Sequence, residues 1–134
     1  MARILIVDDE EMDRVLGRAI LEEAGHELYY AGDGHMALAV CREVDVELVV
    51  TDLAMPEFNG LRFIKELREE GFRMPVIAIS GWAKDQLDLA ESYGADFTLF
   101  KPIDGDKLLN AVQEMLHLPG LSDRADPWRQ GRGR

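Results

Sequence analysis

The sequence predicts an α/β fold in which a five-stranded parallel sheet carries helices on both faces. Five short segments of strand-forming residues alternate with five stretches of helical spacing, in units of about 20 to 25 residues. Three of the five strand segments are almost continuously apolar, which is typical of strands covered on both faces. The length of 134 residues, 47% of them hydrophobic, suits one domain with a sizeable core and not two.

The expected strands are short runs with bulky apolar residues. The continuous apolar stretches ILIV, LVV and VIAI lie in the first, third and fourth of them. The five strand ranges are Arg3–Val7, Leu28–Ala31, Glu47–Thr51, Pro75–Ile79 and Asp96–Phe100.

The expected helices show apolar residues three and four positions apart. In Glu11–Ala24 this spacing forms one apolar stripe, and Gly25 stands where a C-terminal cap belongs. A similar stripe runs from Leu108 to Leu116 and predicts the last helix. Shorter helices are predicted at Gly34–Arg42, Leu61–Glu70 and Lys84–Tyr93.

Composition and charge exclude several function classes. The net charge is −11, and residues 1–117 alone carry −13, so the body of the chain repels nucleic acid and anionic membranes. No apolar run reaches the roughly 18 residues of a membrane span, and we find no signal peptide after Met1. Cys41 is the one cysteine, which excludes an intrachain disulfide and fits a reducing compartment. A cytoplasmic location is expected.

The two ends of the chain differ in character. Residues 1–117 are expected to form the folded domain. Residues 118–134 are rich in Pro, Gly and Arg and carry +2, so we expect a flexible C-terminal tail, with docking through Trp128 as the alternative.

Polar side chains follow four of the predicted strands. Asp8 and Asp9 come after the first, Asp52 after the third, Ser80 after the fourth and Lys101 after the fifth. Parallel strands bring their carboxyl ends to one edge of the sheet, where ligands bind in such folds. The sequence therefore predicts three carboxylates, one hydroxyl and one ammonium group at a common edge.

This set of groups favours phosphoryl transfer assisted by a divalent ion. A nucleotide-binding loop would place glycines after the first strand, whereas this chain places four acids there. Clustered oxygen ligands suit Mg²⁺, which brings an anionic phosphoryl group within reach. Lys101 and Ser80 would neutralise the phosphoryl oxygens. Asp52 is the best candidate for the nucleophile because it ends the central strand of the pattern.

The chain resembles the receiver domains of bacterial two-component response regulators, of the chemotaxis-receiver type, over about residues 2–117. Each motif alone is weak, and together, in order and at the right strand ends, they are highly specific. They are Ile4–Glu10 (ILIVDDE), Thr51–Gly60 (TDLAMPEFNG), Ile79–Gly81 (ISG) and Gly94–Asp96 (GAD) followed by Phe100–Pro102 (FKP). The resemblance implies a flavodoxin-like doubly wound sheet with strand order 2-1-3-4-5.

The resemblance also implies roles at the site. Asp52 would accept phosphate from a phosphohistidine, and Mg²⁺, with Mn²⁺ as an alternative, would be held by Asp9 directly, by Asp8 through water, by Asp52 and by the carbonyl of Ala54. Ser80 and Lys101 would bind the phosphoryl oxygens. Phe100 would turn inward when Ser80 moves toward the phosphate.

Further residues would shape the loops of the site. Met55, Pro56, Asn59 and Gly60 would form the loop beside the acceptor, and Gly81 would leave room for loop movement. The bond between Lys101 and Pro102 is expected to be cis.

Two positions that tune the lifetime of the phosphate in this family carry Ala54 and Trp82 here. Neither side chain orients an attacking water as an amide or a carboxylate would, so we expect slow self-dephosphorylation. An Ala54→Asn variant is expected to lose its phosphate faster.

Other interpretations stay open at this stage. Asp8 and Asp9 could cap the first helix, Asp52 could start a turn, and Phe100 could belong to the core. The chain could be an aspartate-dependent phosphatase of similar topology, although Ala54 stands where such enzymes carry a second Asp. It could also be a degenerate receiver that acts only as a binding module, against which the complete set of site residues speaks.

The expected partners are proteins. A histidine kinase or a histidine phosphotransfer protein would donate the phosphoryl group, and an unknown downstream protein would read the switch. A homodimer is left open. Direct nucleic-acid and membrane binding are not expected.

Overall fold

The computed structural model describes residues 2–54, 59–81 and 84–117, and within these ranges every side chain except those of residues 11–16 and 84. The described backbone alternates strand and helix five times. The strands are β1 (Arg3–Val7), β2 (Glu27–Ala31), β3 (Leu48–Asp52), β4 (Val76–Ser80) and β5 (Phe97–Phe100). The helices are α1 (Glu11–Glu23), α2 (Gly34–Glu43), α3 (Gly60–Glu69), α4 (Lys84–Tyr93) and α5 (Gly105–Leu116).

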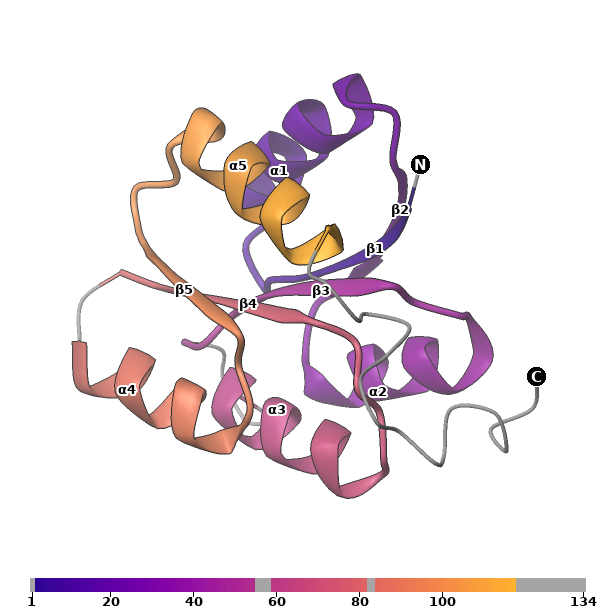
Figure 1. The fold of residues 1–134 in the computed structure, drawn as a ribbon, viewed down its shortest axis with the longest axis vertical. Helices are drawn as coiled ribbons and strands as arrows, with labels where there is room; N and C mark the ends of the chain where they lie inside the picture. Colours follow the sequence, from indigo (N-terminus) through magenta and orange to yellow (C-terminus); the bar gives the residue numbers. More distant parts are fainter. Residues whose placement is uncertain (1, 55–58, 82–83, 118–134) are drawn as a thin grey trace.

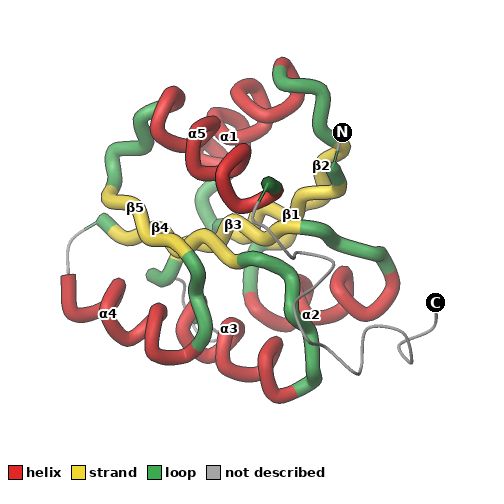
Figure 2. The backbone as a smooth tube through the Cα atoms, in the orientation of Figure 1, coloured by secondary structure: helices red, strands yellow, loops and turns green. Residues whose placement is uncertain are grey.

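All five strands pair in parallel, in the order β2-β1-β3-β4-β5. Helices α1 and α5 cover one face of the sheet, and α2, α3 and α4 cover the other (Figures 1 and 2). The predicted fold class and strand order are confirmed. Every predicted strand boundary lies within one residue of the observed one.

The alternation of side chains along the strands produces two cores. Leu5 and Val49 point toward α2, α3 and α4, whereas their neighbours Ile4 and Val50 point toward α1 and α5. All four are buried, which explains why these strands read as continuous apolar runs rather than as an alternating pattern. The single thiol, Cys41, lies in the first of these cores, and burial raises its pKa to about 12, so it stays protonated.

Arg68 of α3 holds the junction between α4 and β5. Its guanidinium donates to the carbonyl of Gly94 at 2.8 Å, to the carbonyl of Phe72 at 3.0 Å and to the carboxylate of Asp96 at 3.1 Å. Gly94 has a φ of 124°, and a Cβ there would lie 2.8 Å from the Arg68 side chain. The motif Gly94–Asp96 therefore fixes β5, and with it Lys101, against the rest of the sheet.

Residues 118–134, the predicted tail, lie outside the described residues. Among the helices that the structure describes, none combines the length and the apolar character that crossing a bilayer requires.

Candidate functional site

Four strands deliver the predicted site residues to one edge of the sheet. Asp52 and Ser80 are the last residues of β3 and β4. Asp8 directly follows β1, and Lys101 directly follows β5. Because all the strands are parallel, these ends lie side by side, as the sequence predicts.

The three acidic residues meet at this edge. Asp8, Asp9 and Asp52 each offer a carboxylate oxygen, and these oxygens all lie within 4.8 Å of one another. Asp8 is 5% exposed and Asp52 is 3% exposed, whereas Asp9 is open to solvent. Three carboxylates this close repel one another, and a divalent cation would reverse that balance. Their hard oxygen donors, with one open side for retained water, fit Mg²⁺.

Lys101 forms an ion pair with Asp52. Its Nζ lies 2.8 Å from Asp52 Oδ2, and the backbone N–H of Lys101 donates to the carbonyl of Ser80 at 2.8 Å. The peptide bond to Pro102 is cis, as predicted. Gly81 leaves space beside the lysine, since a Cβ there would lie 3.7 Å from Lys101 Cδ.

Ser80 carries a hydroxyl that lacks a partner within the described part of the chain. The residue is 1% exposed, and its Oγ is buried without a hydrogen bond to any described residue. A buried hydroxyl without a partner is costly in free energy. Ser80 pairs in register with Phe100, the residue before Lys101, so this hydroxyl lies at the same edge as the ammonium group. An incoming anionic oxygen would satisfy it.

The backbone after the acceptor is held close to its carboxylate. Ala54 N–H donates to Asp52 Oδ1 at 3.1 Å, and Gly60 N–H donates to the carbonyl of Leu53 at 3.1 Å. Asn59 caps α3 by accepting from Arg62 N–H. Met55 and Pro56, which are predicted to shape this loop, lie outside the described residues.

The capping interpretation of Asp8 explains only part of its contacts. Asp8 Oδ1 accepts the N–H of Glu10 at 2.9 Å, and Glu10, the N-cap residue of α1, makes no side-chain capping bond. This bond shapes the turn into α1. It does not explain why the carboxylate of Asp8 meets that of Asp52, 44 residues later in the sequence.

Phe100 is 56% exposed and directly precedes Lys101. The core interpretation of Phe100 is therefore wrong for this conformation. The predicted inward turn stays a prediction. Trp82, the predicted lifetime-tuning residue two positions after Ser80 in the sequence, lies outside the described residues.

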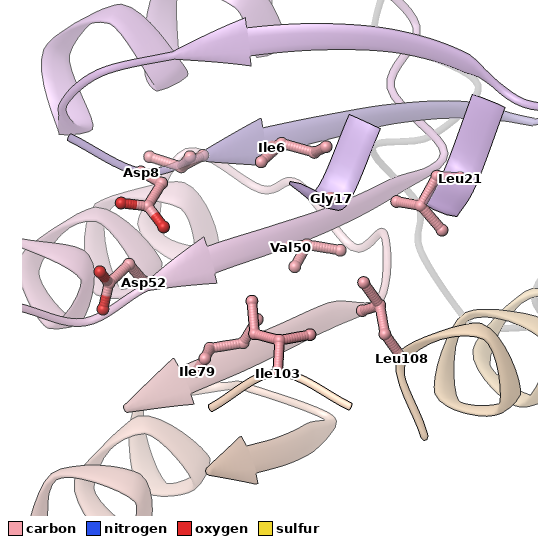
Figure 3. A pocket seen from close by; sticks show the side chains of 10 residues that line it. Ile6, Asp8, Gly17, Leu21, Val50, Asp52, Ile79, Ile103 and Leu108 are labelled. Atoms are coloured by element: carbon pink, nitrogen blue, oxygen red, sulfur yellow. The ribbon is translucent and has the colours of Figure 1, made fainter. Parts of the chain in front are cut away.

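A small cavity lies beneath the acidic edge, between the sheet and helices α1 and α5. Figure 3 shows the carboxylates of Asp8 and Asp52 at one end, facing each other, and aliphatic side chains such as Val50 and Leu108 around the rest. Its volume is about 20 Å³, room for about one water molecule. A substrate must therefore approach the carboxylates from the solvent side.

Comparison with known proteins identifies the family. The profile of the response regulator receiver domain matches residues 4–113. The chain is a response regulator receiver domain. A receiver domain is a phosphoacceptor switch in two-component signalling rather than an enzyme with turnover of its own.

Two curated relatives are about one-third identical in sequence to this chain. The receiver domain is 34% identical over 120 residues to the regulatory protein AtoC of Escherichia coli, covering 89% of this chain and 26% of AtoC. It is 33% identical over 118 residues to the sensory/regulatory protein RpfC of Xanthomonas campestris, covering 84% of this chain and 16% of RpfC. The chain thus spans about a quarter or less of the length of these two relatives.

Solved structures agree with the fold. The receiver domain superposes on the chemotaxis protein CheY4 of Vibrio cholerae with a TM-score of 0.81 at 28% identity, over 87% of this chain and 99% of CheY4. It superposes on the response regulator TrrA of Thermotoga maritima with a TM-score of 0.79 at 32% identity, over 87% of this chain and all of TrrA. That TrrA structure is a complex with Mg²⁺–BeF.

Sequence reasoning missed one residue of the site. Thr51 is fully buried, and its Oγ1 donates to the carbonyl of Asp52 at 2.9 Å. The available signal was a hydroxyl-bearing residue in a strand that is otherwise aliphatic up to the acceptor, LVVTD.

Proposed function

We propose that Asp52 is the residue that accepts the phosphoryl group. A carboxylate oxygen of Asp52 forms a bond to phosphorus while the bond between phosphorus and the donor imidazole nitrogen breaks. One observation carries this assignment: Lys101 Nζ contacts Asp52 Oδ2 at the edge where the Ser80 hydroxyl also lies, buried and without a hydrogen bond to any described residue. A cation and a hydroxyl donor beside one carboxylate suit the charge that spreads over the phosphoryl oxygens.

The metal site follows from the same carboxylates. Asp8, Asp9 and Asp52, together with the backbone carbonyl of Ala54, would hold Mg²⁺, with Mn²⁺ as the alternative. The bound ion supplies positive charge next to the phosphoryl oxygens. The similarity to TrrA of Thermotoga maritima, which was solved with Mg²⁺–BeF, supports this choice.

The remaining residues serve the switch. Lys101 transfers its ion pair from Asp52 to the new phosphoryl group, and Ser80 donates its hydroxyl to a phosphoryl oxygen. Phe100 moves inward once Ser80 is engaged, and Gly81 and the cis bond before Pro102 shape the loops that carry these groups. The phosphorylated state is favoured only by as much as these new contacts stabilise it.

The protein context is part of the proposal. The receiver domain comprises residues 1–117, and residues 118–134 form a tail. The phosphoryl donor is a histidine kinase or a histidine phosphotransfer protein, the output is binding of a downstream protein, and homodimers are one form that binding can take. Phosphoryl transfer and partner binding take place in the cytoplasm, which is consistent with a chain whose one cysteine is a free, buried thiol.

Mass spectrometry tests the proposed function directly. Incubation with a small acyl phosphate and Mg²⁺ is expected to add one phosphoryl group, about 80 Da, and chelation by EDTA is expected to prevent the addition. A chain whose mass stays unchanged with Mg²⁺ present would support the binding-module alternative. Sustained release of phosphate from small phosphate esters would support the phosphatase alternative.

The lifetime of the phosphate is expected to be long, because Ala54 has no polar side chain to orient a water molecule toward the phosphorus. Ala54→Asn introduces an amide two residues after Asp52 and is expected to raise the dephosphorylation rate about tenfold. This is less than the roughly 10²–10⁴-fold that a positioned general base contributes, because an amide orients a water molecule without accepting its proton. Loss of the added mass over time measures the rate in both proteins. A wild-type lifetime of seconds, or a variant no faster than the wild type, would contradict this expectation.

A further inference from the structure

We propose that Thr51 is a positioning residue of the phosphoacceptor site. Its hydroxyl holds the backbone carbonyl of Asp52 and thereby orients both the acceptor carboxylate and the carbonyl of Ala54. The inference rests on the proposed function of Asp52 and Ala54, and it adds a residue that touches neither the metal nor the phosphoryl group.

The environment of Thr51 shows that its hydroxyl has a specific task. The residue is fully buried and pairs in register with Val7 on one side and Ala78 on the other. An aliphatic β-branched residue would fill such a position in the sheet equally well. A buried hydroxyl costs free energy unless it is hydrogen-bonded, and here the acceptor is the carbonyl of Asp52, at 2.9 Å.

The peptide that Thr51 holds lies where the sheet ends. Leu53 N–H donates to the carbonyl of Ile79 at 3.0 Å, and the carbonyl of Leu53 accepts from Gly60 N–H. The carbonyl of Asp52 also lies so close to Gly60 that a Cβ there would lie 2.2 Å from the carbonyl oxygen. The peptide plane between Asp52 and Leu53 is therefore fixed at both of its polar groups.

The orientation of this peptide decides the geometry of the predicted metal ligands. Asp52 Oδ1 accepts the N–H of Ala54 at 3.1 Å, so a rotation of the intervening peptide would move the carboxylate relative to Ala54. The carbonyl of Ala54, a predicted ligand, lies two peptides further along, and the peptide between them is held by the bond from Gly60 N–H to the carbonyl of Leu53. Residues that orient ligands in this way affect metal affinity without contacting the ion.

Two pairs of variants separate the hydroxyl of Thr51 from its packing. Thr51→Val keeps the shape of the side chain and removes the hydroxyl, whereas Thr51→Ser keeps the hydroxyl and removes a methyl group. Thr51→Ala and Thr51→Ser both lack that methyl group and differ in the hydroxyl, so this second pair still tests the hydroxyl if Thr51→Val folds poorly.

The measurements are Mg²⁺ affinity, followed through the NMR signal of the Ala54 amide, and the rate of phosphoryl uptake from a small acyl phosphate. We expect Thr51→Val and Thr51→Ala to weaken Mg²⁺ binding about tenfold and to slow uptake by a similar factor. Thr51→Ser is expected to stay within about twofold of the wild type in Mg²⁺ affinity and in uptake rate, because it keeps the hydroxyl. The loss of the methyl group leaves a small cavity in this variant. The Ala54 amide shift without metal is expected to change in Thr51→Val and not in Thr51→Ser.

Two results would overturn the inference while leaving the proposed function intact: Thr51→Val binding Mg²⁺ as tightly as the wild type, or Thr51→Ser losing as much affinity as Thr51→Ala. The second result would mean that Thr51 acts through packing. A wild-type chain that neither binds Mg²⁺ nor gains a phosphoryl group would overturn the proposed function itself, and the inference with it.

Discussion

Asp52→Asn is expected to abolish phosphoryl uptake. The amide has the size of the carboxylate, and its oxygen can still accept the N–H of Ala54, which bonds Asp52 Oδ1 in the wild type. It lacks the negative charge that makes the carboxylate a nucleophile and that pairs with Lys101 at 2.8 Å. We expect the rate of mass gain with acyl phosphate and Mg²⁺ to fall by at least about a thousandfold.

Asp33→Asn is the matched control for Asp52→Asn. Asp33 is the N-cap of α2 and accepts the N–H of Met36 at 2.9 Å, a role that asparagine fills equally well. The control changes the net charge of the chain by the same amount, at the same edge of the sheet after β2 but outside the cluster of Asp8, Asp9 and Asp52. It should take up phosphate like the wild type. If Asp52→Asn gains the phosphoryl group at the rate of Asp33→Asn, the acceptor is another residue.

Gly60→Ala is expected to cause the largest loss of stability of any small substitution near the site. A Cβ at position 60 would lie 2.2 Å from the carbonyl oxygen of Asp52 and 2.8 Å from the Cα of Leu53. Both neighbours are backbone atoms, so the start of α3 or the end of β3 must move. Overpacking against a rigid backbone costs about 3 kcal/mol of unfolding free energy, measurable by urea denaturation.

Gly17→Ala provides the contrast within the same fold. Gly17 lies inside α1 and lines the cavity of Figure 3, and among the described side chains a Cβ there would meet only the end of Ile6, at 3.4 Å. Alanine is favoured over glycine in a helix interior by about 0.5 to 1 kcal/mol, so this variant is expected to unfold at equal or higher urea concentration than the wild type. Equal stability of the Gly60→Ala and Gly17→Ala variants would contradict the expected clash at Gly60.

Gly60→Ala is also expected to change the geometry of the metal site. The same shift that relieves the clash displaces the carbonyl of Asp52, which also accepts the hydroxyl of Thr51. We therefore expect Mg²⁺ affinity to fall in Gly60→Ala even at low temperature, where the variant is fully folded.

The sequence by itself determined the elements and the edge at which the chemistry is placed. Strands such as Arg3–Val7 and helices such as Lys84–Tyr93 were predictable because the spacing of apolar residues is a local property of the chain. One further inference, that strands joined by helical crossovers run parallel, predicts that their carboxyl ends meet at one edge. That edge brings together Asp8, Asp52, Ser80 and Lys101. The strand order came from the resemblance to receiver domains, because alternation alone does not specify it.

Only the tertiary structure decided which groups touch. Lys101 contacts Asp52 across 49 residues of sequence, Ser80 keeps a buried hydroxyl without a described partner, Thr51 bonds the carbonyl of Asp52, and Arg68 holds Gly94 and Asp96. A displacement of about one ångström between packed strands and helices would make or break these contacts. A residue pattern specifies only the face or the edge on which a side chain lies. The sequence shows Thr51 as a hydroxyl in an aliphatic strand, but it does not predict the partners of Thr51 and Arg68. All of those partners except the Asp96 carboxylate are backbone carbonyls, which every residue carries.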